Sequence, residues 1–192
     1  MTRREWITTM AALPLAVRGE DRGRVITVEN FDAARLGAAI FAESNRARTA
    51  EKRARLFPQA ELNAAAADQA VTMAARLRPS HDGPFAGRAN AFERVRQAGL
   101  DPEMVAENVS AISLPATDSG ETWGDDYGKL AEVIVKEWMN SPGHRRNLLR
   151  RDLTHLGCAA RLARVPMGPP RVFSVQVFCR PKNERWTPFA ER

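Results

Sequence analysis

Two histidines and one glutamate are the residues of this 192-residue chain whose types best suit chemistry. The chain has only three histidines, and two of them, His81 and His144, each follow a segment that breaks a helix. Imidazole nitrogens and carboxylate oxygens are common ligands of divalent transition metals, and the same groups serve as general acids and bases. The sequence therefore offers His81, Glu107 and His144 as candidates for a metal site or for an acid–base site.

Spacing alone does not unite these three residues. They lie far apart along the chain, and no compact motif such as HExxH is present. Each also has an ordinary structural interpretation: Glu107 as a surface carboxylate, and the two histidines as loop residues or helix caps. The third histidine, His155, stands beside the start of a strand pattern and is expected at the surface. On the residues alone, the functional and the structural interpretations both stay open.

Helical periodicity predicts the elements that position the two histidines. Helices are expected over 32–52, 60–77, 90–100 and 126–140. Asn30 or Asp32 can cap the start of the first helix. The segment after residue 77 contains two prolines and a glycine, and Pro142-Gly143 follows the last helix, so both helices are expected to stop sharply. His81 and His144 should therefore lie just beyond helix ends, each able to face a common space.

The strands are predicted mostly near the C-terminus. Residues 106–112 look β-like, and 156–162 and 173–179 alternate apolar and polar residues around a Pro-Gly-rich turn. Helices first and a hairpin last, without β-α-β alternation, predict an α+β fold with an antiparallel sheet. The hairpin sets Cys158 opposite residues 178–179. Cys158 and Cys179 are therefore candidates for a cross-strand disulfide, which the sequence leaves open.

The N-terminus has the layout of an export signal. Arg3-Arg4 precede a mostly apolar stretch that ends in small residues, and the arginine pair points to the twin-arginine route. The alternative is an ordinary amphipathic helix. We assign residues 1–17 to the signal, 18–31 to a linker, 32–179 to the domain and 180–192 to a C-terminal tail.

Composition excludes several classes of protein. The chain is 44% apolar and 27% charged, which suits one globular domain, and no apolar run approaches the ~20 residues of a membrane span. The net charge is +6 and the isoelectric point about 10.1, which favours contact with anionic cell-surface polymers or lipids. Nucleic acid is not expected as a partner, because no zinc-finger spacing or aromatic-rich RNA-binding signature is present.

Short motifs between Ala34 and Phe178 stand in a recognisable order. They are Asn45-Arg46-Ala47-Arg48, Ser80-His81, Glu93-Arg94, Ala106-Glu107-Asn108-Val109, the block WMNSPGHRRNLL at 138–149, Leu156-Gly157 and Gln176-Val177-Phe178. Together they resemble the CAP superfamily (cysteine-rich secretory, antigen 5 and pathogenesis-related proteins), and most closely its bacterial secreted SCP-like branch. The SPGHRRNLL and AEN motifs are the most specific.

This resemblance implies a three-layer α-β-α sandwich with an open central cleft. In the family, two histidines and two glutamates line the cleft and bind a divalent metal, often zinc, in some members. His81, Glu107 and His144 match three of these positions, and Ser141 stands where the second glutamate is expected. The resemblance thus implies a cleft that also includes Asn108 and Ser141, with zinc as the candidate cofactor on the three matching residues.

The family resemblance also implies a function. It favours a secreted, non-enzymatic binding domain whose partner is a cell-envelope polymer, a lipid or a protein. The alternative is a metal-dependent hydrolase, a peptidase or esterase, that uses the same cleft. No Ser/His/Asp or Cys/His nucleophile set supports that alternative. Among neighbouring residues, Arg94 is expected to pair with a carboxylate, Asn108 to bond backbone near the cleft, Asn147 to brace the segment after His144, and Trp138 to be core.

Overall fold

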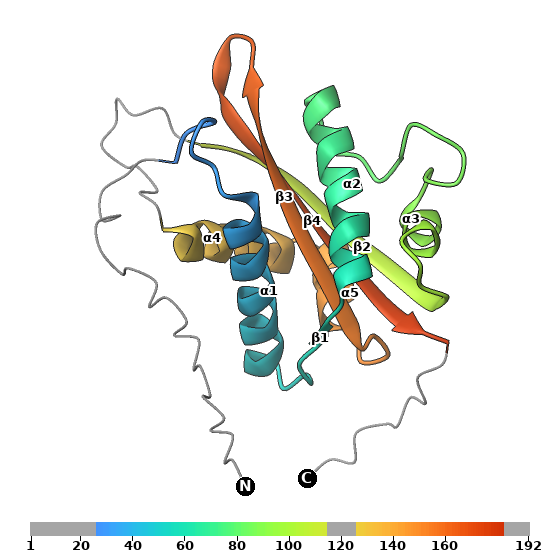
Figure 1. Cartoon of the computed structure of the whole chain (residues 1–192). Coiled ribbons are helices and arrows are strands. Elements are labelled where there is room, and N and C mark those ends of the chain that lie inside the picture. Colours follow the sequence, from blue (N-terminus) through green and yellow to red (C-terminus); the bar gives the residue numbers. More distant parts are fainter. Residues whose placement is uncertain (1–25, 115–125, 183–192) are drawn as a thin grey trace, which may run out of the picture.

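A four-stranded sheet between two layers of helices forms the fold (Figure 1), as seen in a computed structural model that describes residues 26–114 and 126–182. The strands are β1 (Phe57–Pro58), β2 (Pro102–Ser113), β3 (His155–Val165) and β4 (Gly168–Pro181). Their order is β1-β3-β4-β2. The three long strands are antiparallel, as expected, whereas the two-residue β1 is parallel to β3.

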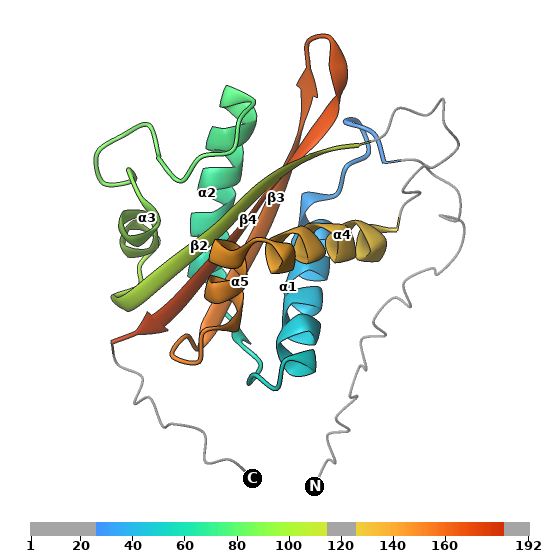
Figure 2. The same ribbon diagram turned by 180° about the vertical axis from the view of Figure 1, so that it is seen from behind.

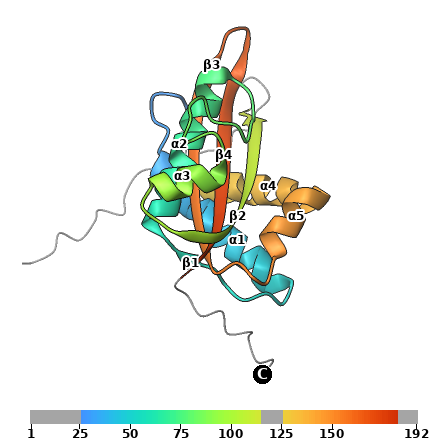
Figure 3. The same ribbon diagram turned by 90° about the vertical axis from the view of Figure 1, so that its right-hand side faces the viewer.

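The helices form two layers, one on each face of the sheet. They are α1 (Ala33–Ala50), α2 (Ala60–Arg76), α3 (Ala91–Gln97), α4 (Tyr127–Asn140) and α5 (Pro142–Leu149). Helices α2 and α3 share one apolar core with the sheet, and α1, α4 and α5 share the other. The view in Figure 3 shows the sheet between these layers. The predicted α-β-α sandwich is confirmed.

Alternation along β4 fills both cores from a single strand. Val172 and Phe178 face the core of α1, α4 and α5, whereas Phe173, Val175 and Val177 face the core of α2 and α3. A strand turns successive side chains to opposite faces. The period-2 pattern in the sequence therefore fixes which residues belong to which core.

Four of the five helices were predicted within a few residues of their ends. The side chain of Asp32 caps α1, because its Oδ1 accepts a hydrogen bond from the backbone N–H of Arg35 at 2.9 Å. The fifth helix, α5, was not predicted. It begins at Pro142, with Ser141 as the single residue between it and the end of α4. Proline suits the first position of a helix, because the N–H that it lacks would have no intrahelical partner there.

Gly157 lets α2 lie directly on β3. A Cβ atom at this position would stand 2.2 Å from the carbonyl carbon of Leu62 in α2. Any side chain would therefore push helix and strand apart. This close approach explains why Gly157 lies within a strand, where glycine is otherwise unfavourable.

Some expectations fall outside the described residues. The export signal at 1–17 and the tail beyond residue 182 are in this group. Near the end of the linker, the sequence over Val25–Val28 is β-like, but its described part, Ile26–Val28, forms no strand. Within the described ranges, no helix combines the length and the apolar character that crossing a membrane requires.

Candidate functional site

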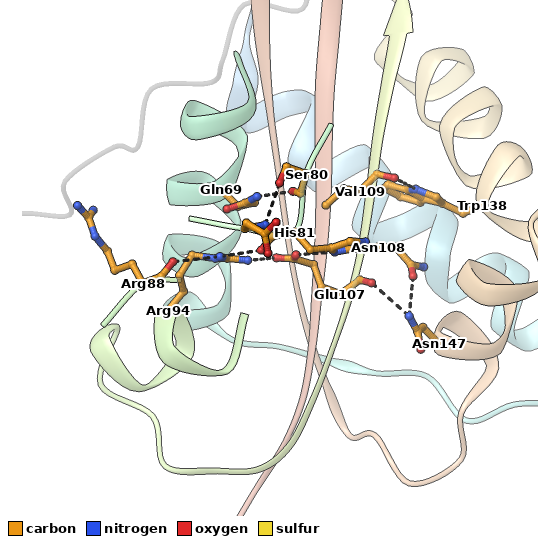
Figure 4. Close-up of polar contacts among 11 residues, drawn as sticks. Gln69, Ser80, His81, Arg88, Arg94, Glu107, Asn108, Val109, Trp138 and Asn147 are labelled. Carbon is orange, nitrogen blue, oxygen red and sulfur yellow. Dashed lines mark hydrogen bonds and ion pairs between the residues drawn. The ribbon is translucent and has the colours of Figure 1, made fainter. Parts of the chain in front are cut away.

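The free edge of β2 is where the chain brings its candidate residues together. Among the residues that the structure describes, β2 is the last strand of the sheet and pairs with β4 alone. Glu107 turns toward the layer of α2 and α3, and its neighbour Asn108 turns toward α5 (Figure 4). Seen from behind, α4 and α5 lie on that second side of the sheet (Figure 2). Two adjacent residues of one strand therefore reach both layers of the molecule.

His81 is held against Glu107 by the segment that follows α2. That helix ends at Arg76, and its C-cap residue Leu77 takes the left-handed conformation with φ 52°. The His81 Nδ1 atom then lies 2.9 Å from Glu107 Oε1. The imidazole itself is 57% exposed, whereas the Glu107 side chain is only 4% exposed. A buried carboxylate thus orients a histidine whose ring faces solvent.

Arg94 supplies the counter-charge that Glu107 needs inside the protein. Its Nη2 lies 2.5 Å from Glu107 Oε2, and both side chains are buried. A buried carboxylate is costly unless it is paired, so this ion pair keeps Glu107 in place. Arg94 Nη1 also donates to the backbone oxygens of His81 and Arg88, both at 3.3 Å. The expected pairing of Arg94 with a carboxylate is confirmed, and the same guanidinium also fixes the segment that carries His81.

The hydrogen bond to Glu107 controls the protonation of His81. It raises the pKa of His81 above the ordinary value of 6.5, against the opposing effect of partial burial. When the ring is neutral, Nδ1 is the protonated nitrogen, because a carboxylate only accepts hydrogen bonds. The other nitrogen, Nε2, is left to meet a ligand.

His144 lies in the first turn of α5 and not in a loop, which corrects the expectation for the Ser-Pro-Gly segment. Ser141 is the N-cap of this helix, but its side chain makes no capping hydrogen bond. Burial, and then the charge of His81, lower the pKa of His144. The charge of His81 therefore disfavours protonation of His144. Ser141 has no such interaction with them in the described structure.

Asn108 fastens α5 to the sheet, as expected for an amide beside the cleft. Its Nδ2 donates to the backbone oxygen of His144 at 3.1 Å and to Gln176 Oε1 at 3.0 Å. Asn147 braces the same helix, because its Nδ2 donates to Asn108 Oδ1 at 3.0 Å and to the backbone oxygen of Glu107 at 3.2 Å. The network continues through Gln176 Nε2 to Ser44 Oγ of α1 at 2.5 Å. One chain of polar contacts thus fixes the backbone that carries His144.

Sequence reasoning missed several residues that support the site. Gln69, fully buried in α2, donates from its amide to the backbone oxygen of Ser80 beside His81. Gln176 and Ser44 complete the network of Asn108. A signal was present for Gln69 and Ser44, because each is a polar residue at a position where helical spacing predicts core. Gln176 gave no such signal, because the alternation over 173–179 places it among the polar positions. Buried polar side chains need hydrogen-bond partners. Here those partners belong to the segments and the network that position the two histidines.

Trp138 is core, as expected, and also protects the edge of β2. Its ring is 1% exposed, and its Nε1 donates to the backbone oxygen of Val109 at 3.2 Å. Asn147 does the same for the backbone oxygen of Glu107. An unpaired strand edge invites association with another strand. Side chains from α4 and α5 therefore occupy backbone acceptors that would otherwise be open.

Coordination of zinc by all three candidate residues does not fit this arrangement. Among residues 26–114 and 126–182, no group of three or more His, Cys, Asp or Glu side chains is arranged to hold a metal ion. Both oxygens of Glu107 are engaged, one by His81 and one by Arg94. The contact that is present, a carboxylate behind the Nδ1 atom of a histidine, is one that metal-bound histidines commonly make through their other N–H.

The expected disulfide between Cys158 and Cys179 is not formed. In the sheet Cys158 pairs with Gln176, and Cys179 pairs with His155. Cys158 belongs to the core of α1, α4 and α5, and Cys179 to the core of α2 and α3. The predicted register was shifted along the hairpin, and thiols on opposite faces of a sheet cannot bond.

His155 is buried, which corrects its assignment to the surface. Its residue is 8% exposed, and the ring of Phe57 lies 5.8 Å away between centroids. The Nδ1 atom lies 2.9 Å from Thr154 Oγ1. The parallel pairing of β1 with β3 places Phe57 opposite His155. That short strand was not predicted, so its cover over the histidine could not be foreseen.

Comparison with known proteins identifies relatives of this fold. The model of the cysteine-rich secretory protein family (CAP) matches residues 41–178. The chain is 31% identical over 77 residues to the uncharacterized protein YkwD of Bacillus subtilis, a match covering 40% of this chain. The match spans only 23% of the length of that relative.

Solved structures resemble the chain in fold. An extracellular protein containing an SCP domain from Bacillus anthracis gives a TM-score of 0.57 at 22% identity, covering 77% of this chain and 41% of that one. An outer surface protein from Borrelia burgdorferi also gives 0.57, at 16% identity, covering 83% of this chain and 99% of that one. At these identities the likeness concerns the fold alone.

Proposed function

The chain belongs to the cysteine-rich secretory protein (CAP) family, and from this premise we propose that it is an exported, non-enzymatic binding domain. Its ligand site is the polar cleft at the free edge of β2, between His81 and His144. The observation that supports the proposal is that both carboxylate oxygens of Glu107 already have partners, His81 and Arg94. Because that carboxylate orients His81 through Nδ1, the Nε2 atom of His81 is set toward solvent as a ready ligand-binding group.

The same observation favours binding over hydrolysis. A metal-dependent hydrolase needs a carboxylate or another base able to accept a proton from water. Glu107 is the buried carboxylate of the cleft, and both of its oxygens already hold partners. The cleft is thus better suited to holding a ligand than to accepting a proton during a reaction.

Zinc is the candidate cofactor of this cleft. We assign the imidazoles of His81 and His144 as the groups that would hold it, and Glu107 as the group that orients His81. The two histidines suit this role in different ways: the contact with Glu107 leaves Nε2 of His81 to face a ligand, and His144 has the protonation state that coordination needs. The lowered pKa of His144 keeps its ring neutral near pH 7, and coordination needs a neutral imidazole.

Export is proposed from two observations of different kinds. Residues 1–17 have the layout of a signal, with the arginine pair of the twin-arginine route. Two structural relatives are described as an extracellular protein and an outer surface protein. The net charge of +6 suits an anionic cell envelope, where a polymer, a lipid or a protein would be the partner.

Calorimetric titration with zinc tests the site. We expect one-to-one binding to the wild-type chain, lost in both His81→Ala and His144→Ala. His155→Gln, which changes the one histidine outside the cleft, should bind as the wild type does once its folding is checked by circular dichroism. Glu107→Gln should weaken binding by about 10- to 100-fold, the usual cost of losing the group that orients a metal-bound histidine.

The contrary results are distinct. If the wild type binds no zinc, the metal assignment falls, and the search moves to organic ligands of the envelope. If Glu107→Gln abolishes binding as completely as the histidine variants do, Glu107 is a direct ligand. If zinc-loaded protein cleaves peptides or esters, and this activity disappears in both histidine variants, the binding-domain proposal itself is wrong.

A further inference from the structure

Two basic segments from distant parts of the chain lie side by side at one end of the molecule. One is 51–55, where α1 ends, and the other is 145–152, which covers most of α5 and the turn after it. Figure 1 shows the end of α1, β1 and the connection from α5 to β3 at the same, lower end. The two segments contain seven basic and two acidic residues, so they carry a net charge of +5 in a chain of net charge +6.

Arg48 holds the two segments together from inside the protein. Its residue is 1% exposed, and its guanidinium donates to three backbone oxygens: Ala54 at 2.8 Å, Leu148 at 2.7 Å and Arg150 at 2.9 Å. One guanidinium thus fixes the backbone on both sides. Burial and the positive charge of Arg53 lower the pKa of Arg48 to about 10.

Most of the positive charge at this end has no partner. Both acidic residues form ion pairs within the segments: Glu51 with Arg145 at 2.8 Å, and Asp152 with Arg150 at 2.7 Å. The remaining basic residues form no ion pair with any described residue; they are Lys52, Arg53, Arg55, Arg146 and Arg151. Four of these five side chains are exposed, Arg53 being half-buried. These unpaired positive charges repel one another in the isolated protein, and contact with an anionic surface would reduce this repulsion.

An exposed aromatic ring stands beside these charges. Phe57 follows Arg55 by two residues and is 62% exposed. Its backbone N–H donates to the oxygen of Thr154 at 2.9 Å, which ties it to the turn that carries Arg151. Surface residues that combine Lys or Arg with a protruding Phe are typical of proteins that lie on a bilayer.

We propose that this basic end, made of Lys52, Arg53, Arg55, Arg146, Arg151 and Phe57, docks on a bilayer of anionic phospholipid. The arginines and the lysine lie against the lipid phosphates, and Phe57 enters the boundary between headgroups and acyl chains. The inference does not depend on the cleft at the β2 edge, because none of these residues belongs to it.

A bilayer fits the observations better than a soluble anionic polymer does. A linear polyanion binds best to basic residues arranged in a row, and an exposed phenylalanine does not strengthen that binding. Here the two basic segments lie at one end of the molecule together with β1, the strand that contains the exposed Phe57. A membrane surface uses both, because it offers dense negative charge above an apolar layer.

Co-sedimentation of the full chain with vesicles tests the proposal. We expect binding to vesicles of equal phosphatidylglycerol and phosphatidylcholine, weakened by added salt, and no binding to phosphatidylcholine alone. The patch variant carries Lys52→Gln, Arg55→Gln, Arg146→Gln and Arg151→Gln. Each Lys or Arg near the surface contributes about fivefold to partitioning, so we expect a loss of more than tenfold. Phe57→Ser should reduce binding several-fold without changing its dependence on salt.

A matched variant separates the patch from net charge. It carries Arg78→Gln, Arg96→Gln, Lys136→Gln and Arg161→Gln, which removes four exposed charges elsewhere that form no ion pair with described residues. This variant should lose less than threefold. Thermal unfolding checks that all proteins are folded, and the pairs Lys52/Arg55 and Arg146/Arg151, changed separately, should each give an intermediate loss.

Three results would overturn the proposal. The first is a wild type that does not sediment with phosphatidylglycerol vesicles. The second is an equal loss in the patch variant and the matched variant, because net charge alone would then explain binding. The third is binding to soluble polyphosphate as tight as to vesicles together with no effect of Phe57→Ser, which would make the partner a polymer and not a bilayer.

Discussion

At the scale of single residues, the geometry of the site depends on the carboxylate of Glu107, which contacts both His81 and Arg94. Glu107 meets a histidine on one oxygen and an arginine on the other. The arginine offsets the free-energy cost of burying the carboxylate, and the carboxylate determines which nitrogen of His81 faces solvent. The function of His81 is therefore decided by two residues, Glu107 and Arg94, that need not touch a ligand.

This sharing predicts the order in which the histidines titrate. We expect proton NMR to give His81 a pKa above 6.5 and His144 a pKa below it, as their partners and burial require. In Glu107→Gln the main cause of the upward shift is lost, while partial burial and the charge of Arg94 still oppose protonation. The pKa of His81 should then fall below 6.5. An unchanged His81 titration would show that the contact with Glu107 does not form in solution.

The raised pKa of His81 and the lowered pKa of His144 have opposite effects on the stability of the fold as the pH falls. Protonated His81 stabilises the fold below its unfolded pKa, and this contribution is lost as pH rises through its raised folded pKa. His144 takes up its proton more readily when unfolded, so it destabilises the fold as pH falls through about 6.5. In Glu107→Gln the stabilising effect of protonated His81 is lost, and a His81 pKa below 6.5 adds to the destabilisation by His144 as pH falls. Its melting temperature should therefore drop more steeply than that of the wild type between about pH 7 and pH 5.

At the scale of elements, close packing of α2 on β3 depends on the absence of a side chain at Gly157. Gly157→Ala would bring a Cβ within 2.2 Å of the backbone of α2. We expect a loss of about 1–3 kcal/mol in the free energy of unfolding, the usual cost of overpacking. The matched control is Gly168→Ala in the β3–β4 hairpin, where the nearest atom would be Val165 Cγ1 at 3.7 Å. Equal losses in urea unfolding of the two variants would contradict the close approach.

Strand register likewise separates the two cysteines. Burial raises the pKa of the Cys158 thiol, and only a thiolate reacts quickly with disulfide reagents. We expect Cys158 to be labelled slowly in the native protein and quickly in denaturant. A reducing agent should leave the melting temperature unchanged. A drop in melting temperature on reduction would instead show that Cys158 and Cys179 are bonded.

At the scale of the whole molecule, stability and binding are divided between different regions. Trp138 joins the core of α1, α4 and α5 to the edge of β2, whereas His144 lies half-buried in the first turn of α5. Trp138→Ala should cost about 3–5 kcal/mol, as expected for an aromatic residue in a core. His144→Ala should cost less than about 1 kcal/mol. Chemical denaturation of both variants checks this, and the reverse order would mean that the roles of the two residues are exchanged.

Local pattern was sufficient for most elements of this protein. Helical spacing predicted α1 to α4, alternation predicted the hairpin of β3 and β4, and the order of elements predicted an α+β sandwich. These features depend on residues that are close in sequence, because a core-facing stripe recurs every few positions. The candidates His81, Glu107 and His144 were also identified from the sequence, through the order of their motifs.

Only the tertiary structure decided how distant residues meet. It joined Arg94 and His81 to Glu107, set Cys158 and Cys179 on opposite faces, covered His155 with Phe57, and brought the basic ends of α1 and α5 together. Each of these depends on strand register or on packing between layers, and a shift of one residue reverses the face on which a side chain lies. A local pattern specifies which face of an element is buried, but the partner across that face is fixed only when the whole core closes.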